Sequence, residues 1–393
     1  MKYSIIEQIT YELKTIFTGY PKFVFSLSPA NIENELPVFV FHTIAPETFE
    51  AQLAFLKENG YRTLSVNAFV RCLRRETPVE PKSVLLTIDD ARSSVWSYAF
   101  PLLKKYQMRA TVFAIPGRTR DAAICRQNLE NVWQNQAEIS ELYKLDPDDR
   151  SLCTWPEIRQ MYDSGLVDIE SHTLFHREVF VGLKIVDFVD ESTLFAPYNS
   201  PVTPYLQKED IGRELQLDNY LGMPLFESAP LMAGKPALRI KNKMLAVCKD
   251  TFAKQVGGSA WKDKLRADLQ SHLTTHVADF QQNGEVESAL AEDLAFAKKI
   301  IQKKLDNRAG NHLCLPYTVG SEAAIAAAKK TGMQSCFWGT VPGRRINVPG
   351  NDPFHSVRIK NDFIWRLPGQ GRKSLFEVYG MKIKRRLNKE QVY

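Results

Sequence analysis

Residues 83–90 read Ser-Val-Leu-Leu-Thr-Ile-Asp-Asp, an apolar run of strand length that ends in two adjacent carboxylates. Runs that are apolar along their whole length are typical of parallel strands buried on both faces. The segments on either side alternate between short β-rich runs and helical patterns, which is the signature of βαβ units around a parallel sheet. We therefore predict an α/β fold built around this strand.

The predicted elements extend from this run in both directions. We expect strands at 37–41, 109–115, 167–170, 312–315 and 335–338, and helices at 46–59, 96–106, 156–163, 287–305 and 321–330. The segments 118–153 and 180–290 break the alternation with polar, irregular or helical sequence, and we interpret them as insertions. The predicted organisation is an N-terminal lead-in at 1–36, the α/β unit at 37–367 and a basic tail at 368–393.

The composition is that of a globular chain and excludes several classes of protein. The 393 residues are 44% hydrophobic and 24% charged, and the net charge of +6 is too mild to indicate a nucleic-acid partner. The 6 cysteines form no Cys-x-x-Cys pair, which favours free thiols in a reducing compartment. No apolar run reaches the roughly 18 residues needed to span a bilayer, and the N-terminus lacks a secretory pattern. We therefore expect a cytoplasmic protein.

Asp89 and Asp90 stand at the carboxyl end of the quoted run, where parallel sheets and barrels place their ligands. One carboxylate could bind a metal while its neighbour accepts a proton. Adjacent Asp residues are also common as helix N-caps, and Ser93 and Ser94 follow here. The pair by itself leaves both interpretations open.

Two histidines follow a later predicted strand. His172 and His176 are separated by one helical turn, a spacing that brings two imidazoles to one metal. His272 and His276 have the same spacing in the second insertion, where we expect ordinary helix residues. Only the first pair follows a strand end that could share a rim with Asp90. Asp90 and this pair are therefore the candidate metal ligands, and such a set leaves positions open for water and substrate.

Residues 314–318, Cys-Leu-Pro-Tyr-Thr, again end a predicted strand. The backbone N–H of Tyr317 could stabilise a developing oxyanion. The alternative is a Pro-Tyr turn with a packed ring.

Together these segments resemble the motifs of the polysaccharide deacetylases of the NodB-homology type, carbohydrate esterase family 4. In that family T-F-D-D-G is followed by H-[ST]-x-x-H and then by R-x-P-Y-G, and the order is the same in this chain. The resemblance covers roughly residues 37–117, 155–180 and 287–367 and leaves both insertions unexplained. It implies a distorted (β/α) barrel.

The resemblance also implies a role for each matching residue. Asp90, His172 and His176 would bind one divalent metal ion, with zinc as the expected metal. Asp89 would be the base that takes a proton from the metal-bound water. The backbone N–H of Tyr317 would hold the oxyanion, and the products would be acetate and an amino sugar.

The chain departs from the family pattern at three positions of these motifs. Ala91 and Thr318 stand where the family has glycine, so we expect no requirement for positive φ at either position. Cys314 stands where the family has arginine, so the guanidinium that orients the catalytic Asp has to come from elsewhere. Arg92 and Arg358 are the candidates for that role.

The family's late histidine acid has no clear match. His355 is the only histidine after Tyr317, and we assign it as the general acid, with an ordinary loop histidine as the alternative. We assign His42, just after the first predicted strand, to the substrate pocket, with a buried structural role as the alternative. Arg358 is also assigned to substrate binding.

The leading hypothesis is a metal-dependent N-deacetylase that acts on an N-acetylated sugar, a cytoplasmic biosynthetic intermediate. A lipid-linked or nucleotide-linked sugar would suit an apolar helical stripe at 5–17 and the basic run at 382–386, which could contact a membrane surface or simply form a solvated tail. Two alternatives remain open. One is a catalytically silent carbohydrate-binding relative, and the other is a deformylase or other amidase that uses the same metal site.

Overall fold

The computed structural model describes residues 19–193, 196–254, 260–272, 278–341 and 343–387. The helix predicted at 5–17 lies outside these ranges, and so does His276 of the second histidine pair. The pairing of His276 with His272 therefore stays untested.

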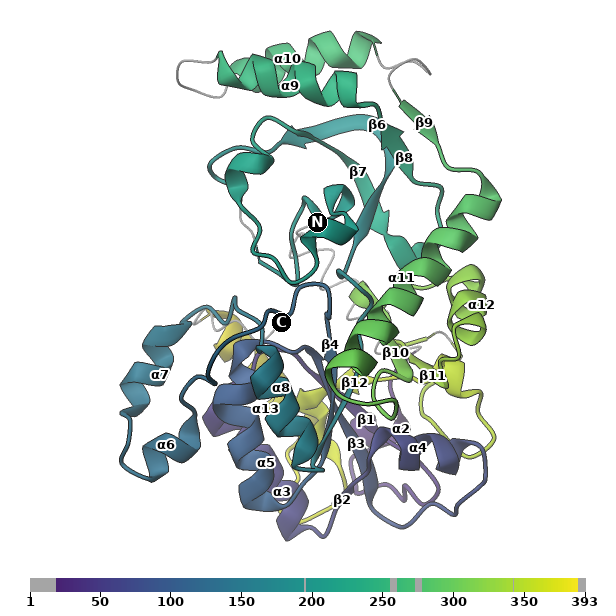
Figure 1. The fold of residues 1–393 in the computed structure, drawn as a ribbon. Coiled ribbons are helices and arrows are strands. Elements are labelled where there is room, and N and C mark those ends of the chain that lie inside the picture. Colours follow the sequence, from purple (N-terminus) through teal and green to yellow (C-terminus); the bar gives the residue numbers. More distant parts are fainter. Residues whose placement is uncertain (1–18, 194–195, 255–259, 273–277, 342, 388–393) are drawn as a thin grey trace.

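A parallel sheet forms the centre of the fold (Figure 1). Its strand order is β11-β10-β5-β4-β3-β1-β12, and β2 pairs with β3 outside this path. All five strands predicted around the quoted run are confirmed, whereas the short β2 and β12 are additional. The bounds are β1 Val38–Phe41, β2 Arg62–Thr63, β3 Ser83–Asp90, β4 Ala110–Ala114, β5 Val167–Ser171, β10 His312–Cys314, β11 Ser335–Phe337 and β12 Ile359–Lys360.

The sheet curls back on itself through the segment that precedes β12. Phe337 at the end of β11 forms a parallel bridge with Ser356. Three residues later, Ile359 of β12 pairs with Phe39 of β1. This segment therefore connects the two ends of the strand order, and the predicted distorted (β/α) barrel is confirmed.

Helices pack around the sheet (Figure 1). Four of the predicted helices lie within a few residues of their expected bounds, and the fifth is a π-helical turn, η1, followed by α5. The short α2 and α4 are not predicted from the sequence. The bounds are α2 Lys22–Phe25, α3 Pro46–Glu58, α4 Val66–Leu73, η1 Val95–Ala99, α5 Phe100–Tyr106, α8 Trp155–Asp163, α11 Asn283–Lys304 and α12 Glu322–Lys330.

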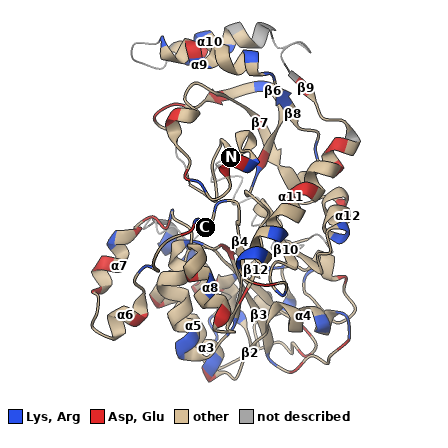
Figure 2. Cartoon of the chain, in the orientation of Figure 1, with Lys and Arg blue, Asp and Glu red and all other residues tan. Residues whose placement is uncertain are grey.

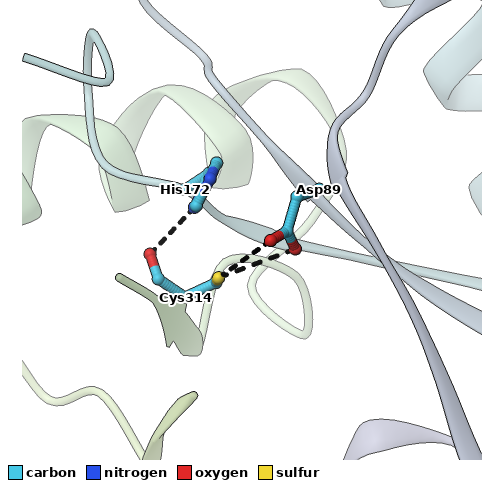
Figure 3. A group of neighbouring side chains, drawn as sticks. All are labelled: Asp89, His172 and Cys314. Atoms are coloured by element: carbon cyan, nitrogen blue, oxygen red, sulfur yellow. Dashed lines mark hydrogen bonds between the residues drawn. The ribbon is translucent and has the colours of Figure 1, made fainter. Parts of the chain in front are cut away.

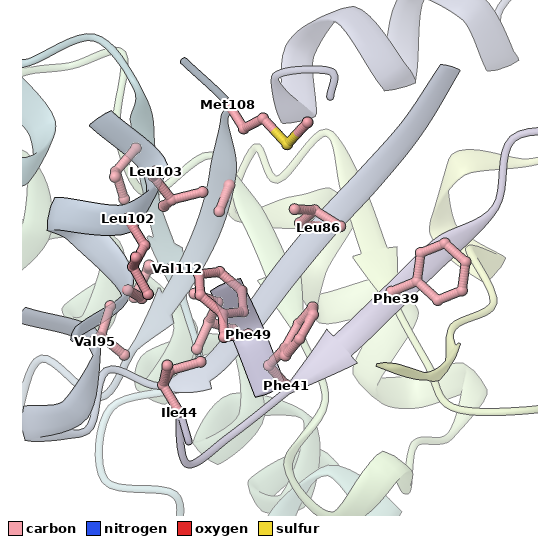
Figure 4. Close-up of a cluster of buried hydrophobic side chains, with 14 of the residues drawn as sticks. Phe39, Phe41, Ile44, Phe49, Leu86, Val95, Leu102, Leu103, Met108 and Val112 are labelled. Atoms are coloured by element: carbon pink, nitrogen blue, oxygen red, sulfur yellow. The ribbon is translucent and has the colours of Figure 1, made fainter. Parts of the chain in front are cut away.

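The largest cluster of buried apolar side chains lies between the sheet and these helices (Figure 4). The ring of Phe41 on β1 meets the ring of Phe49 on α3 edge-on, with the centroids 5.2 Å apart. Every residue of β3 is buried, including the two carboxylates at its end. A strand that is apolar until its last two positions therefore carries Asp89 and Asp90 into the interior.

The first insertion fixes the turn after β3. Its helices are α6 Leu129–Trp133 and α7 Ile139–Leu145. Asp149 then accepts hydrogen bonds from the backbone N–H of Ser94 at 2.9 Å and from the hydroxyls of Ser93 and Ser94 at 2.9 and 2.7 Å. These serines are therefore held by a carboxylate of the insertion.

The second insertion forms a lobe of its own beside the sheet (Figure 1). Our interpretation of 180–290 as polar, irregular or helical misses its strands. The longest strand pair, β6 with β7, is antiparallel and contains register shifts, which break the period of two that a sequence pattern needs. The bounds are β6 Glu178–Phe188, η2 Thr203–Tyr205, η3 Lys208–Asp210, η4 Leu217–Asn219, β7 Pro224–Pro230, η5 Leu231–Ala233, β8 Leu238–Ile240, α9 Asn242–Ala253, α10 Ala260–His272 and β9 Ala278–Phe280.

The basic C-terminal segment is a docked helix, α13 Leu375–Leu387, rather than a free tail. Lys382 is buried, and its ammonium lies 5.4 Å from the ring centroid of Phe363. Arg385 forms an ion pair with Asp362. The expectation of a solvated or membrane-contacting basic run is therefore wrong for Lys382 and Arg385, because the fold itself uses these two cations.

Charged residues of both signs are interspersed over the described chain (Figure 2). This mixture agrees with the mild net charge of +6. Among the described helices, none combines the length and the apolar character needed to cross a bilayer.

A buried asparagine holds the segment that closes the barrel. The Asn347 amide donates to the carbonyls of Leu36 at 3.2 Å and Val357 at 2.8 Å, and its carbonyl accepts from the Val357 N–H at 2.9 Å. We expect Asn347→Ala to lower the free energy of unfolding by about 2–3 kcal/mol, because it leaves buried backbone groups unpaired. Chemical denaturation measures this loss.

Asn351→Ala is the matched control for this prediction. Asn351 is half-buried, and its side chain accepts a hydrogen bond from the Val348 N–H at 3.1 Å. We expect this variant to cost less than about 1 kcal/mol. Equal losses in the two variants would contradict the special role of Asn347.

Candidate active site

The candidate residues gather at the carboxyl edge of the sheet. Asp89 and Asp90 end β3, His172 follows β5 directly, and His42 follows β1 directly. Because the carboxyl ends of parallel strands meet at one edge, residues that are far apart in the chain become neighbours there.

Asp90, His172 and His176 form a compact group of possible metal ligands. Asp90 Oδ1 lies 3.6 Å from His172 Nε2 and 4.0 Å from His176 Nε2. One ligand atom from each of the three buried residues falls within 4.8 Å of the others. These separations are too long for good hydrogen bonds but suit donors that surround one ion at about 2.0–2.2 Å. The group therefore fits a divalent cation.

Both imidazoles are held in a state that favours ligation. The Cys314 carbonyl lies 3.0 Å from His172 Nδ1 (Figure 3), so this nitrogen is assigned the proton and Nε2 keeps a lone pair towards Asp90. Burial, with a further contribution from His172, lowers the pKa of His176 to about 3. His176 is therefore neutral at neutral pH, as a metal ligand must be.

Asp89 is held by a buried guanidinium. Arg358 Nη1 donates to Asp89 Oδ1 at 2.6 Å, and Arg358 Nη2 donates to Asp89 Oδ2 at 2.8 Å. The Arg358 side chain is 1% exposed, and its Nε donates to the Trp338 carbonyl at 3.1 Å. The assignment of Arg358 to substrate binding is therefore wrong in this geometry, because the buried guanidinium is paired with Asp89. Both Asp89 oxygens are engaged by Arg358, which leaves no support for Asp89 as a helix cap.

Asp89 is ionised in this environment. Burial raises the pKa of Asp89, but the charge of Arg358, with contributions from His172 and His42, more than offsets burial and holds the pKa well below its usual range. The Cys314 thiol lies 3.6 Å from both Asp89 oxygens (Figure 3), and burial raises its pKa well above the ordinary value. Asp89 thus has a cation on one side and a neutral thiol on the other.

Asp90 is paired with the second candidate guanidinium, Arg92. Arg92 Nε donates to Asp90 Oδ2 at 2.9 Å, and Arg92 Nη1 donates to Thr43 Oγ1 at 2.9 Å. The Tyr198 ring from the second insertion covers this guanidinium at 3.8 Å. Asp90 therefore turns Oδ2 to Arg92 and Oδ1 to the imidazoles. The sequence around Tyr198 indicates only a loop, so nothing in it points to this contact.

The structure brings two further candidates to the cluster. His42 Nε2 lies 3.8 Å from Asp89 Oδ2, and burial lowers the pKa of His42 to about 4. The Tyr317 ring lies 4.5 Å from the His176 ring. His42 and Tyr317 are thus in position to border a bound substrate, and these roles stay predictions.

His355 lies apart from this cluster. Its ring stacks on Trp338 with the centroids 5.7 Å apart, and its Nδ1 lies 3.0 Å from Asp352 Oδ2. Among the described residues, no recorded contact joins His355 to Asp89 or the imidazoles. Its assignment as general acid therefore stays a prediction that this geometry does not support.

The backbone around the site is strained. Ala91 and Thr318 stand at the two motif positions where the family has glycine. The angle φ is 58° at both residues. The expectation that positive φ is not required is therefore wrong at both positions. A left-handed conformation costs a residue other than glycine about 1–2 kcal/mol, and such strain concentrates at functional sites. The other residues of the site with positive φ are Asp90, Thr173, His176 and Tyr317.

Comparison with known proteins finds similarity to polysaccharide deacetylases over part of the chain. Residues 76–216 match the model of the family described as polysaccharide deacetylase. The poly-beta-1,6-N-acetyl-D-glucosamine N-deacetylase of Escherichia coli (strain K12) is 30% identical over 148 residues, which are 38% of this chain and 20% of that protein. Bacillus subtilis (strain 168) YxkH, provisionally named a polysaccharide deacetylase, is 35% identical over 153 residues, which are 37% of this chain and 44% of that protein. The chain thus spans less than half the length of these curated relatives.

Two solved structures are similar to parts of this chain. A de-N-acetylase from Aggregatibacter actinomycetemcomitans has a TM-score of 0.48 and 17% identity, covering 83% of this chain and 95% of that one. A deacetylase domain from Bordetella bronchiseptica has a TM-score of 0.48 and 16% identity, covering 84% and 97%. The strand order of this chain and the bridge between Phe337 and Ser356 show the barrel.

The strain at Thr318 leads to a stability prediction. Thr318 is exposed and β-branched, so its side chain contributes little packing while its φ of 58° is unfavourable. We expect Thr318→Gly to raise the free energy of unfolding by about 1 kcal/mol, measured by chemical denaturation. Thr318→Ala keeps a Cβ at positive φ and should gain clearly less. A loss of stability in the glycine variant would show that the Thr318 side chain is needed.

Proposed function

We propose that the protein is a metal-dependent N-deacetylase of an N-acetylated carbohydrate, and the match of residues 76–216 to the polysaccharide deacetylase model supports this proposal. One observation carries the proposal: the buried group of Asp90, His172 and His176 lies directly beside an ionised Asp89. Metal-assisted hydrolysis of an amide uses both ligands for a cation and a base, whereas a carbohydrate-binding relative has no use for the combination.

The residues of the site divide the work of hydrolysis between them. A divalent ion supplies the polarisation of the amide carbonyl and the acidification of water when it is bound. Asp89 takes a proton from the attacking water, since it is ionised and adjoins the ligand group. The backbone N–H of Tyr317, whose ring lies 4.5 Å from the His176 ring, is the proposed donor to the oxyanion. The amide bond then breaks to give acetate and an amine, and His355 is the proposed, untested source of the amine's proton.

Arg358 is the proposed positioning residue for this base. It presents two N–H groups to the two oxygens of Asp89, which is the geometry in which a guanidinium holds a carboxylate best. Cys314 leaves room for this arrangement, because its neutral thiol occupies the place where the family's motif has an arginine.

The finer parts of the proposal concern the metal, the compartment and the substrate. Zinc is the proposed metal because one carboxylate and two imidazoles are among its usual ligands. The proposed compartment is the cytoplasm, in keeping with 6 cysteines that are all free. An N-acetylated sugar is the proposed substrate class, and its attachment to a lipid or a nucleotide stays a prediction.

Metal content and acetate release test the proposal together. We expect about one divalent ion per chain by elemental analysis of the wild type, and its loss in His172→Ala. Asp89→Asn should keep the ion and release acetate from N-acetylated oligosaccharides about 10²–10⁴-fold more slowly, because the base is gone. An Asp89→Asn protein with the wild-type rate would remove Asp89 as the base.

The same assays separate the alternatives. A protein that takes up no divalent ion after exposure to zinc would favour the silent carbohydrate-binding relative. A metal-loaded protein that releases formate, but no acetate, from the corresponding N-acylated sugars would favour the deformylase.

The pH profile tests Arg358. We expect Arg358→Gln to move the acid limb of the kcat/KM profile to higher pH, because burial would then raise the pKa of Asp89 without the opposing charge of Arg358. Arg358→Lys keeps the charge and should give a smaller shift. The metal content should stay at the wild-type level in both variants. An unshifted acid limb in Arg358→Gln would contradict the proposed positioning role.

A further inference from the structure

A cavity lies in the lobe of the second insertion, beside the loop that carries His172 and His176. Its volume is about 660 Å³, within the range of small-molecule sites. Leu174 and Phe175, which stand between His172 and His176, form part of its wall. None of the candidate catalytic or metal-binding residues lines the cavity.

Most of the cavity wall is apolar. The apolar side chains come from β6, from the residues that flank β7, from β8 and from α11, which lie in this part of the molecule (Figure 1). A wall of this kind favours a ligand with hydrocarbon surface. Among the residues that form it are Val179, Phe180, Met223, Leu238, Ile240 and Phe296.

Two of the cations that line the cavity are already paired with acidic partners. The Lys208 ammonium lies 2.5 Å from Glu292, and the Arg239 guanidinium lies 2.5 Å from Glu285. All four side chains are exposed, so these charges are satisfied at the surface of the lobe.

Arg177, a third cation of the cavity wall, has only some of its N–H donors in hydrogen bonds. Its Nη2 donates to the Leu206 carbonyl at 2.6 Å, and its guanidinium lies 5.2 Å from the Phe175 ring. Its Nε is buried and has no hydrogen-bond partner among the described residues. A guanidinium carries five N–H donors, so Arg177, which lines the cavity, keeps donors for a ligand oxygen.

Among the acidic residues, Asp293 acts most strongly on the charge of Arg177, ahead of Asp210 and Glu292. Its Oδ2 accepts the Leu174 N–H at 2.9 Å, and burial raises its pKa to about 6. No ion pair within 4.0 Å joins Asp293 to Arg177, both of which the structure describes. The cavity therefore combines apolar walls with one cation that has capacity for an anion.

We propose that this cavity binds a single-chain amphiphile whose phosphate monoester head pairs with Arg177 and whose hydrocarbon chain lies against the apolar walls. A guanidinium matches phosphate oxygens in pairs, which suits this head group. The site is separate from the deacetylation chemistry, because it contains none of the catalytic candidates.

Calorimetry on the full chain tests the proposal, with octyl phosphate, octyl glucoside and inorganic phosphate as probes below their micellar concentrations. We expect saturable binding of octyl phosphate and at least tenfold weaker binding of the other two. Arg177→Gln should weaken octyl phosphate at least tenfold and leave octyl glucoside unchanged. Arg177→Lys, which keeps the charge, should fall between the wild type and Arg177→Gln.

A matched pair of variants on α11 locates the chain of the probe. Ala289 lines the cavity, so Ala289→Phe should fill it and abolish binding. Ser288 is exposed on the same helix, so Ser288→Phe should bind like the wild type. Circular dichroism establishes that each variant is folded.

Several results would overturn the proposal. These are an absence of saturable binding, equal binding of inorganic phosphate, equal binding of octyl glucoside, or wild-type affinity in folded Arg177→Gln or Ala289→Phe. Because no turnover is measured, failure here leaves the proposed deacetylase activity standing, and loss of that activity leaves this site testable.

Discussion

The buried ion pair between Asp89 and Arg358 is the interaction on which the site depends. Two adjacent carboxylates at the buried end of a strand repel each other and are costly to desolvate, so each needs its own cation. Asp90 takes Arg92 from the following turn, whereas Asp89 takes Arg358 from the segment that closes the barrel. Closure of the sheet and ionisation of the proposed base are therefore coupled, because the same few residues accomplish both.

The guanidinium that contacts Asp89 comes from a different segment of the chain than the family motif implies. The motif position at the end of β10 holds Cys314, and its protonated thiol contacts the carboxylate without supplying charge. Arg358 approaches the same carboxylate from the opposite end of the strand order, because the curled sheet brings the two ends together. In a barrel the carboxyl ends of all parallel strands face the same edge, so Cys314 and Arg358 can both reach Asp89. A flat sheet with the same strand order would hold Cys314 and Arg358 far apart.

The two insertions are part of the site rather than additions to it. Asp149 of the first insertion holds Ser93 and Ser94, the residues that follow the carboxylates. Tyr198 of the second insertion covers Arg92, and the rest of that insertion encloses a cavity against the histidine loop. The strained backbone at Ala91 lies where the first insertion meets the barrel, since the Cys153 N–H donates to the Ala91 carbonyl, and the surrounding packing supplies the free energy that holds it.

The sequence by itself determined the α/β class and the order of the main strands and helices along the chain. It also identified four candidate residues of the site, Asp89, Asp90, His172 and His176. These are local properties, since hydrophobic periodicity shows where a strand ends and polar residues directly after it must lie at the carboxyl edge. Only the tertiary structure decided that Arg358 faces Asp89, that Ala91 keeps a positive φ, and that the basic C-terminal segment packs as a helix. Each of these depends on contacts between residues far apart in the chain, and neither spacing nor periodicity carries a signal for such contacts.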